Sequence, residues 1–165
     1  MTETFDPLRT LRTLEAYGVD FVLIGGFAGS LHGSALITSD VDICYERSPG
    51  NLERLTEALV DLGATLRGVD EPVPFQLEAK SLAAGDAFTF ATRLGALDIL
   101  GVPAGTDGFD DLRSAAVTMD LGGFDVPVAN LQDLIRMKRA AGRPQDLAAV
   151  EHLGALADLI DGIEE

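Results

Sequence analysis

The spacing of apolar residues changes along the chain, and each spacing predicts one kind of element. Behind Asp6 and Pro7, leucines recur every three residues, which predicts a helix that Asp6 caps and that ends at Gly18. The uninterrupted apolar run at 21–24 predicts a buried strand. Residues 40–45 begin with acidic and apolar side chains in alternation, so they predict a second strand.

The rest of the chain predicts further helices and short strands, separated by glycine and proline. In chain order, we expect a short helix at about 27–33, an amphipathic helix at 51–62, short strands within 64–100 of which 96–100 is the clearest, a short helix at 110–116, a hairpin at 117–128 through Gly122-Gly123, a helix capped by Asn130 and, after a break at 142–144, a last helix from Asp146. This order predicts an α/β (α+β) fold with a mixed β-sheet, helices packed on one face and a helical C-terminus.

Length and composition fit one cytoplasmic domain. The 165 residues, 47% of them hydrophobic, predict a single domain over 1–165, with a core at about 18–128 and C-terminal helices at about 130–161. The only cysteine, Cys44, cannot form an internal disulfide, which favours a reducing compartment. The N-terminus has no basic and apolar signal pattern, and no apolar run approaches the roughly 20 residues of a membrane span. We therefore expect a cytoplasmic protein that has no membrane partner.

The chain is strongly acidic, with a net charge of −15. Nucleic-acid affinity comes largely from Lys and Arg that neutralise phosphates, so this charge disfavours extended nucleic-acid binding. A small anionic substrate held through a divalent metal ion remains compatible with it. The charge thus makes an extended nucleic acid a less favoured partner, but it does not exclude binding through a local basic patch.

Asp40 and Asp42 are the strongest chemical signal. Side chains alternate along a strand, so both carboxylates face one side while Val41 and Ile43 face the core. Two such carboxylates repel each other unless a cation lies between them, and Mg²⁺ or Mn²⁺ prefers oxygen ligands of this kind. Acidic residues fill 27 of 165 positions, so one Asp-x-Asp could also arise by chance. It is, however, the only Asp-x-Asp in the sequence, and its neighbours are apolar.

Gly25 and Gly26 follow the strand at 21–24. Glycines at such a turn let backbone amides approach a phosphate beside a helix N-terminus. A plain tight turn is the commoner explanation of the pair. Neither the dinucleotide pattern Gly-x-Gly-x-x-Gly nor a phosphate loop with Gly-Lys-Ser/Thr occurs here.

Together these residues resemble a known family. Leu23-Ile24-Gly25-Gly26, thirteen further residues and Asp40-Val41-Asp42-Ile43 resemble the signature of the DNA polymerase β-like nucleotidyltransferase superfamily. Residues 31–34, Thr38 and 131–147 also resemble its small bacterial members, the minimal nucleotidyltransferases and the abortive-infection type toxins. The resemblance implies a nucleotidyltransferase fold and a Mg²⁺- or Mn²⁺-dependent enzyme. Such an enzyme transfers a nucleoside monophosphate from an NTP to an acceptor hydroxyl on a protein, an RNA or a small molecule.

The resemblance also implies which residues carry the reaction. The expected catalytic and metal-binding residues are Asp40, Asp42 and Asp98; the expected nucleotide-binding residues are Gly25, Gly26, Ser34, Lys138 and Arg143. Asp98 could instead be an ordinary strand acid on a solvated face. If it lies on the opposite face of the sheet, Asp86 or Asp120 becomes the candidate. Lys138 and Arg143 could equally be the basic end of a helix. Asp146 is expected to cap the last helix, to pair with a nearby base, or both.

The sequence departs from the family pattern at two positions before the aspartates. Leu36 stands where many relatives carry Arg, and Ser39 stands where relatives are often basic. These departures leave open a catalytically weakened nucleotide-binding or protein-interaction module on the same fold. A toxin that acts on tRNA and pairs with an antitoxin is the other alternative, which the acidic charge disfavours.

Overall fold

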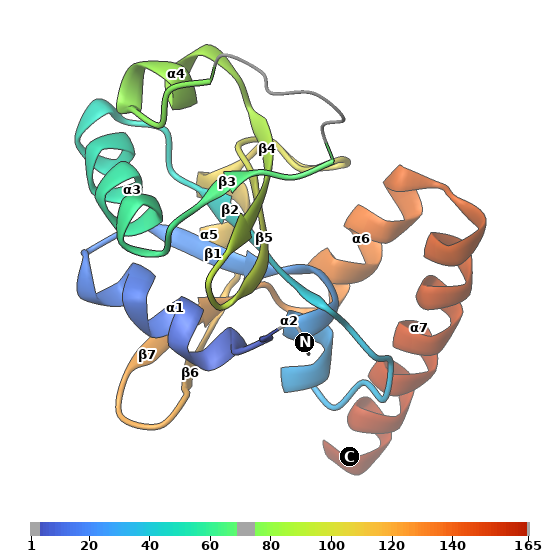
Figure 1. Cartoon of the computed structure of the whole chain (residues 1–165). Coiled ribbons are helices and arrows are strands. Elements are labelled where there is room, and N and C mark those ends of the chain that lie inside the picture. Colours follow the sequence, from blue (N-terminus) through green and yellow to red (C-terminus); the bar gives the residue numbers. More distant parts are fainter. Residues whose placement is uncertain (1–3, 69–74, 165) are drawn as a thin grey trace.

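The computed structural model describes residues 4–68 and 75–164, and within them a seven-stranded sheet is flanked by helices (Figure 1). The helices are α1 (Pro7–Ala16), α2 (Gly25–Leu31), α3 (Pro49–Asp61), α4 (Ala79–Ala84), α5 (Phe109–Ser114), α6 (Leu131–Ala141) and α7 (Pro144–Glu164). The strands are β1 (Phe21–Ile24), β2 (Asp40–Tyr45), β3 (Thr65–Leu66), β4 (Ala87–Thr92), β5 (Gly95–Leu100), β6 (Val117–Asp120) and β7 (Asp125–Val128). The expected mixed sheet and helical C-terminus are therefore confirmed.

Strands β5, β2 and β1 form the centre of the sheet, whose order is β3-β4-β5-β2-β1-β7-β6. Strand β2 runs parallel to β5 and antiparallel to β1, and β1 runs parallel to β7. Val41 and Ile43 on β2 are buried, as are Leu97 and Ile99 on β5. These side chains form the apolar face that the alternation along β2 predicts.

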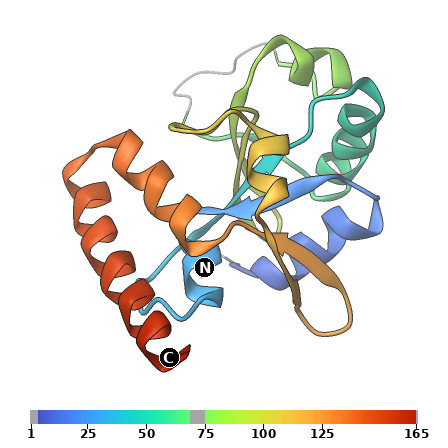
Figure 2. The same ribbon diagram turned by 180° about the vertical axis from the view of Figure 1, so that it is seen from behind.

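The helices lie on both faces of this sheet and beside it. Figure 1 shows α1 and α3 together on one face, and Figure 2 shows the short α5 on the opposite face, where it contacts β1. Helices α6 and α7 pack against each other beside the sheet, away from α1 and α3. A Cβ added to Gly29 or Gly33 would lie 3.7 Å from Leu153 or Leu156, so α7 packs closely on the α2 region.

Local signals explain where several helices begin and end. The Asp6 carboxylate accepts a hydrogen bond from the backbone N–H of Arg9 (3.1 Å), and the Asn130 side chain accepts one from Asp133 (2.7 Å). Both caps were predicted. Gly142 ends α6 with a φ of 69°, a left-handed conformation that glycine adopts without strain.

Four of the predicted elements need correction. Helix α4 lies in the segment predicted as strands; with six residues and Leu82 as its one buried side chain, it is too short to show a helical period. Helices α3 and α7 begin earlier than predicted, at Pro49 and Pro144, because proline fits the first turn of a helix. Helix α2 begins at Gly25 and contains the glycine pair. Among the described residues, no helix is long and apolar enough to cross a membrane.

Candidate active site

Three carboxylates meet where β2 and β5 run side by side. Asp40 and Asp42 lie on one face of β2, and Asp42 pairs in register with Asp98 on β5. One oxygen from each of the three side chains lies within 4.8 Å of the others. The parallel pairing places Asp98 on the same face as Asp42, as the strand period requires. The structure thus brings together the three acids that the sequence and the family resemblance singled out.

The electrostatics of this cluster favour a bound cation. Burial raises the pKa of Asp42 to about 7, and the negative charge of Asp40 adds to the effect. Burial also raises the pKa of Asp98, while Arg67 opposes that rise. Carboxylate oxygens that are partly buried and short of positive charge are suitable ligands for a hard divalent cation. The residues present therefore fit the metal ion that the fold family implies.

Two neighbouring side chains hold Asp40 and Asp98 in place. The Thr38 hydroxyl donates to the backbone carbonyl of Asp40 (3.1 Å) and lies 3.4 Å from its carboxylate. On the other side, Arg67 Nη2 donates to Asp98 Oδ1 at 2.8 Å. Thr38 belongs to the segment that resembles the family, whereas no sequence pattern indicated Arg67.

The two glycines lie against this cluster. Gly25 has a φ of 76°, and a Cβ at this position would lie 2.8 Å from Cβ and Cγ of Asp42. A Cβ on Gly26 would lie 3.0 Å from the Thr38 hydroxyl. A Cβ on Gly25 would therefore force Asp42 to move, whereas a Cβ on Gly26 would be a tight contact that Thr38 must yield to slightly. The glycine pair therefore serves close approach to Asp42 and Thr38 as well as the turn itself.

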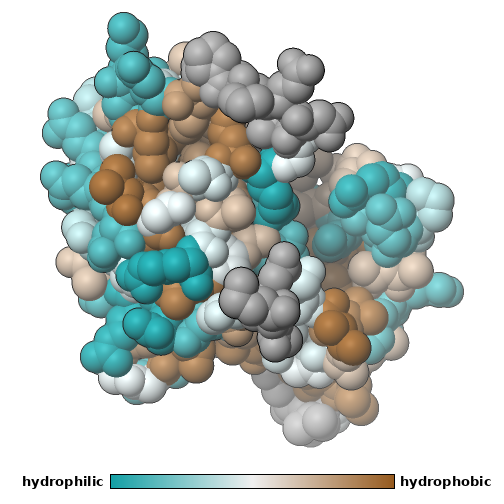
Figure 3. Space-filling view, in the orientation of Figure 1, coloured by the Kyte–Doolittle hydropathy of each residue, from teal (hydrophilic) through white to brown (hydrophobic). Residues whose placement is uncertain are grey.

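A cavity of about 590 Å³ opens at the carboxylates, between the sheet and the C-terminal helices. Figure 3 shows the surface hollowed between the body of the molecule and α6–α7. All the predicted site residues line this cavity: Gly25, Gly26, Ser34, Asp40, Asp42, Asp98, Lys138 and Arg143. Leu36 and Ser39 line it too, so the two departures from the family pattern face the same space.

Asp146 engages both of the predicted phosphate-binding cations. Its side chain is only 1% exposed, and it accepts from Arg143 Nε at 2.6 Å and from Lys138 Nζ at 3.4 Å. The hydrogen bond from Arg143 lowers the pKa of Asp146. Asp146 therefore pairs with nearby bases, and its Oδ2 also accepts a hydrogen bond from the backbone N–H of Arg143 (3.3 Å) directly before α7, so both expected roles are found. Lys138 and Arg143 line the cavity with part of their charge already neutralised.

The two substitute candidates for the third carboxylate lie elsewhere. Asp120 accepts hydrogen bonds from the backbone N–H groups of Gly122 and Gly123, at 3.0 and 2.8 Å, in the turn between β6 and β7. Neither Asp120 nor Asp86 lines the cavity. Asp98 is therefore the acid that completes the cluster.

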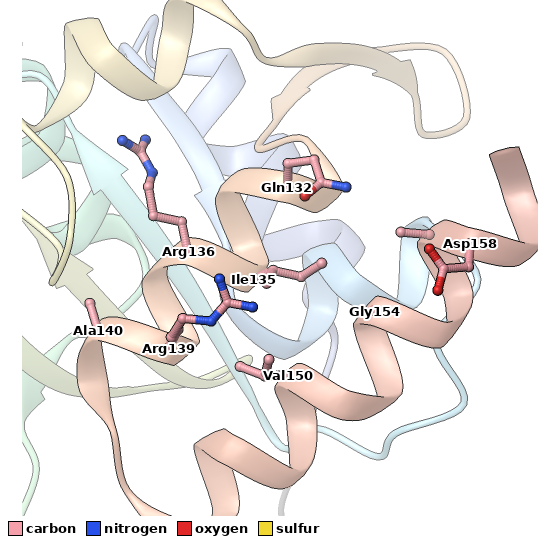
Figure 4. A pocket seen from close by; sticks show the side chains of 9 residues that line it. Gln132, Ile135, Arg136, Arg139, Ala140, Val150, Gly154 and Asp158 are labelled. Carbon is pink, nitrogen blue, oxygen red and sulfur yellow. The ribbon is translucent and has the colours of Figure 1, made fainter.

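A second cavity, of about 630 Å³, lies between α6 and α7 and contains none of these residues. Figure 4 shows Arg139 of α6 and Val150 of α7 on its two walls. Arg136, which also lines it, pairs with Asp111 and Asp133 at 3.1 Å each. Arg136 thereby joins α6 to α5 through Asp111.

Comparisons with known proteins agree with this geometry at the level of fold. No family model and no curated protein matches the sequence. The lincosamide antibiotic adenylyltransferase LnuA, solved with lincomycin bound, superposes with a TM-score of 0.62 at 13% identity, over 94% of this chain and 99% of that one. A protein from Thermotoga maritima described as a nucleotidyltransferase gives 0.55 at 15% identity, over 97% of each chain. The antibiotic-resistance factor ANT(2'')-Ia gives 0.53 at 12% identity, over 93% and 83%.

These structural neighbours show that the chain has the nucleotidyltransferase fold, as the resemblance to the DNA polymerase β-like superfamily implied. Their identities of 12–15% mean that the likeness extends to the fold and not to individual residues.

Proposed function

We propose that the protein is a metal-dependent nucleotidyltransferase that moves a nucleoside monophosphate from an NTP to an acceptor hydroxyl. The observation that carries the proposal is the meeting of Asp40, Asp42 and Asp98 in a cavity whose wall contains the Gly25-Gly26 turn. Its fold is that of the nucleotidyltransferases, which agrees with this chemistry but does not by itself establish it.

Each group has a defined role in the proposed reaction. The acceptor oxygen attacks the α-phosphorus, the bond from this phosphorus to the pyrophosphate breaks, and the acceptor proton passes to Asp98. Asp40 and Asp42, with Asp98, would hold the divalent cation, which supplies positive charge to the phosphates when bound. Gly25 and Gly26 let Asp42 and Thr38 approach the backbone at the cavity wall, and Lys138 and Arg143, which also line the cavity, offer positive charge to the phosphates.

We propose a hydroxyl-bearing small molecule as the first acceptor class to test. Two of the structural neighbours act on or confer resistance to antibiotics, as their names state. The cavity wall also includes apolar side chains such as Leu36, Ile37 and Met137. The net charge of −15 disfavours tRNA, so a toxin-type activity with an antitoxin partner is the less favoured form of the proposal.

Pyrophosphate release tests the proposal. The protein is incubated with each NTP and Mg²⁺ or Mn²⁺, together with a panel of hydroxyl-bearing small molecules, with tRNA, or with cell protein. We expect release that depends on metal and acceptor, and that Asp42→Asn abolishes. Equal release by wild type and Asp42→Asn, or no release with any acceptor class while the protein remains folded, would contradict the enzyme assignment.

One observation favours a second candidate, a nucleotide-binding module without turnover. Lys138 and Arg143 both engage Asp146, and Leu36 stands where an arginine would meet a triphosphate. Calorimetric titration separates the two candidates. Metal-dependent NTP binding without pyrophosphate release, across all acceptor classes, would support the module.

A further inference from the structure

Arg67 reaches the carboxylate cluster from the edge of the sheet. It directly follows β3, and its backbone N–H donates to the carbonyl of Thr89 on β4 (2.9 Å). From there the side chain crosses β4 to β5, where Nη2 donates to Asp98 Oδ1 at 2.8 Å. Nη1 donates at the same time to the carbonyl of Phe90 (3.3 Å). The guanidinium is therefore fixed at two points and meets the acid from one defined direction.

The ion pair lies in an unusual place for one that only stabilises the fold. Exposed ion pairs stabilise a fold only slightly, and this one is partly open, since the side chains of Arg67 and Asp98 are 35% and 17% exposed. Its carboxylate, however, pairs in register with Asp42 and completes the cluster with Asp40. Arg67 bonds only to Oδ1 of Asp98, which leaves the second oxygen for the cluster. The contact thus fixes the direction of an acid at the proposed site.

Other basic groups do not provide this contact. The loop at 33–39 contains no Lys or Arg, and Lys138 and Arg143 are ion-paired with Asp146. In the part of the chain that the structure describes, Arg67 is the basic residue ion-paired with a member of the cluster.

We propose that Arg67 is a positioning residue of the site, which holds Asp98 Oδ1 so that the other carboxylate oxygen stays turned toward Asp40 and Asp42. This inference rests on the proposed nucleotidyl transfer, because it assigns Arg67 to the same site. Loss of the contact would let the Asp98 side chain rotate. Partners that orient metal ligands typically change metal affinity or activity by about 10–100-fold when they are removed.

The test compares three variants with the wild type. Arg67→Met keeps the length of the side chain and removes the charge. Arg67→Lys keeps the charge but lacks the planar guanidinium group that bonds to Asp98 and Phe90 at the same time. Arg93→Met is the matched control. Arg93 also donates to a backbone carbonyl, that of Asp61, and it lies 3.8 Å from the carboxylate of the same residue. It does not line the cavity. Mn²⁺ binding is measured by electron paramagnetic resonance, and kcat and KM for the NTP by pyrophosphate release.

We expect Arg67→Met to weaken Mn²⁺ binding by about tenfold and to lower kcat by about 10–100-fold, with KM for the NTP changed less than threefold. Arg67→Lys should recover part of both losses, and Arg93→Met should change neither. Tighter Mn²⁺ binding by Arg67→Met would overturn the inference, since it would show that Arg67 competes with the metal. Behaviour equal to that of Arg93→Met would overturn it as well.

Failure of the proposed function gives a different result. A wild type that neither binds Mn²⁺ nor releases pyrophosphate would overturn the function, and the role of Arg67 with it. A wild type that does both, while Arg67→Met matches it, would overturn only the role of Arg67. Thermal unfolding in EDTA checks that each variant remains folded.

Discussion

Gly25 lies so close to Asp42 that a Cβ on the glycine would stand 2.8 Å from Cγ of the carboxylate side chain. We therefore expect Gly25→Ala to displace the Asp42 carboxylate and to weaken Mn²⁺ binding by tenfold or more, a rough figure from the sensitivity of metal sites to ligand orientation. Calorimetric titration with Mn²⁺ measures the effect.

Gly63→Ala is the control for backbone strain. Gly63 has a similar φ of 65°, and a Cβ there would meet nothing within 4 Å. This variant should lose roughly 1 kcal/mol of stability, because φ is positive, and keep its metal affinity. Equal metal affinity in both variants would show that the Asp42 side chain moves aside without consequence.

The raised pKa of Asp42 predicts a pH dependence of stability in EDTA. The folded protein binds this proton with a pKa of about 7, against about 3.9 in the unfolded chain. The stability gained from the proton is complete below about pH 4 and is lost as the pH rises through 7. The unfolding free energy of the wild type, minus that of Asp42→Asn, should therefore fall by roughly 1–3 kcal/mol from pH 5 to pH 8. Urea unfolding at the two pH values measures it, and a difference that does not change would show that Asp42 is ionised throughout.

Addition of Mg²⁺ or Mn²⁺ should reverse this instability near neutral pH. A cation that binds only the folded state stabilises it by about 2.7 kcal/mol at one hundred times its Kd. We expect a rise in Tm for the wild type that Asp42→Asn largely abolishes. Glu53→Gln, which changes an exposed acid on α3, should keep the full rise. An equal rise in all three proteins would indicate a general effect of ionic strength.

Leu36→Arg should tighten NTP binding. Leu36 lines the cavity and is 45% exposed, so an arginine there can reach phosphate without displacing core residues. A charged hydrogen bond to phosphate is worth roughly 1.5–3 kcal/mol where water is excluded, or about tenfold in Kd per 1.4 kcal/mol. Calorimetry with and without Mg²⁺ measures the gain. Val60→Arg adds the same charge on α3 outside the cavity, and an equal gain from it would point to net charge alone.

Asp146→Asn tests whether the buried acid restrains the two cations. Removing the charge frees Lys138 and Arg143, so we expect NTP to bind several-fold more tightly. The same change should destabilise the fold by roughly 1–3 kcal/mol, because a buried hydrogen-bonded charge is lost. Calorimetry and urea unfolding report the two effects separately. Weaker NTP binding would show instead that Asp146 holds the cations in the position that phosphate needs.

Sequence reasoning located the site where its signals were local. That Asp40 and Asp42 face the same side of β2 follows from the strand period alone. The helix caps at Asp6 and Asn130 follow from short-range hydrogen bonding. The position of Asp98 in the cluster could be predicted only from the family resemblance. No local pattern shows that β5 pairs with β2 in the register that sets Asp98 opposite Asp42.

The sequence pattern could not predict contacts between segments that are far apart in the chain. Arg67 and Asp98 are 31 positions apart, and their pairing depends on the antiparallel packing of β3, β4 and β5. Likewise, the family resemblance predicted that Lys138 and Arg143 bind phosphate, but the sequence could not say how far Asp146 offsets their charge. How far one charge offsets another depends on the burial of the side chains, which only the three-dimensional packing determines.

The cavity takes its walls from both ends of the chain, since Gly25 and Asp42 come early and Lys138 and Arg143 come late. The ribosome adds Asp40, Asp42 and Asp98 to the chain before it adds α6 and α7. Because a domain generally folds as a unit, we expect the two walls to come together only when α6 and α7 have joined the fold. For the proposed function, this means that a nascent chain would hold nucleotide fully only after α6 and α7 have emerged and packed beside the sheet.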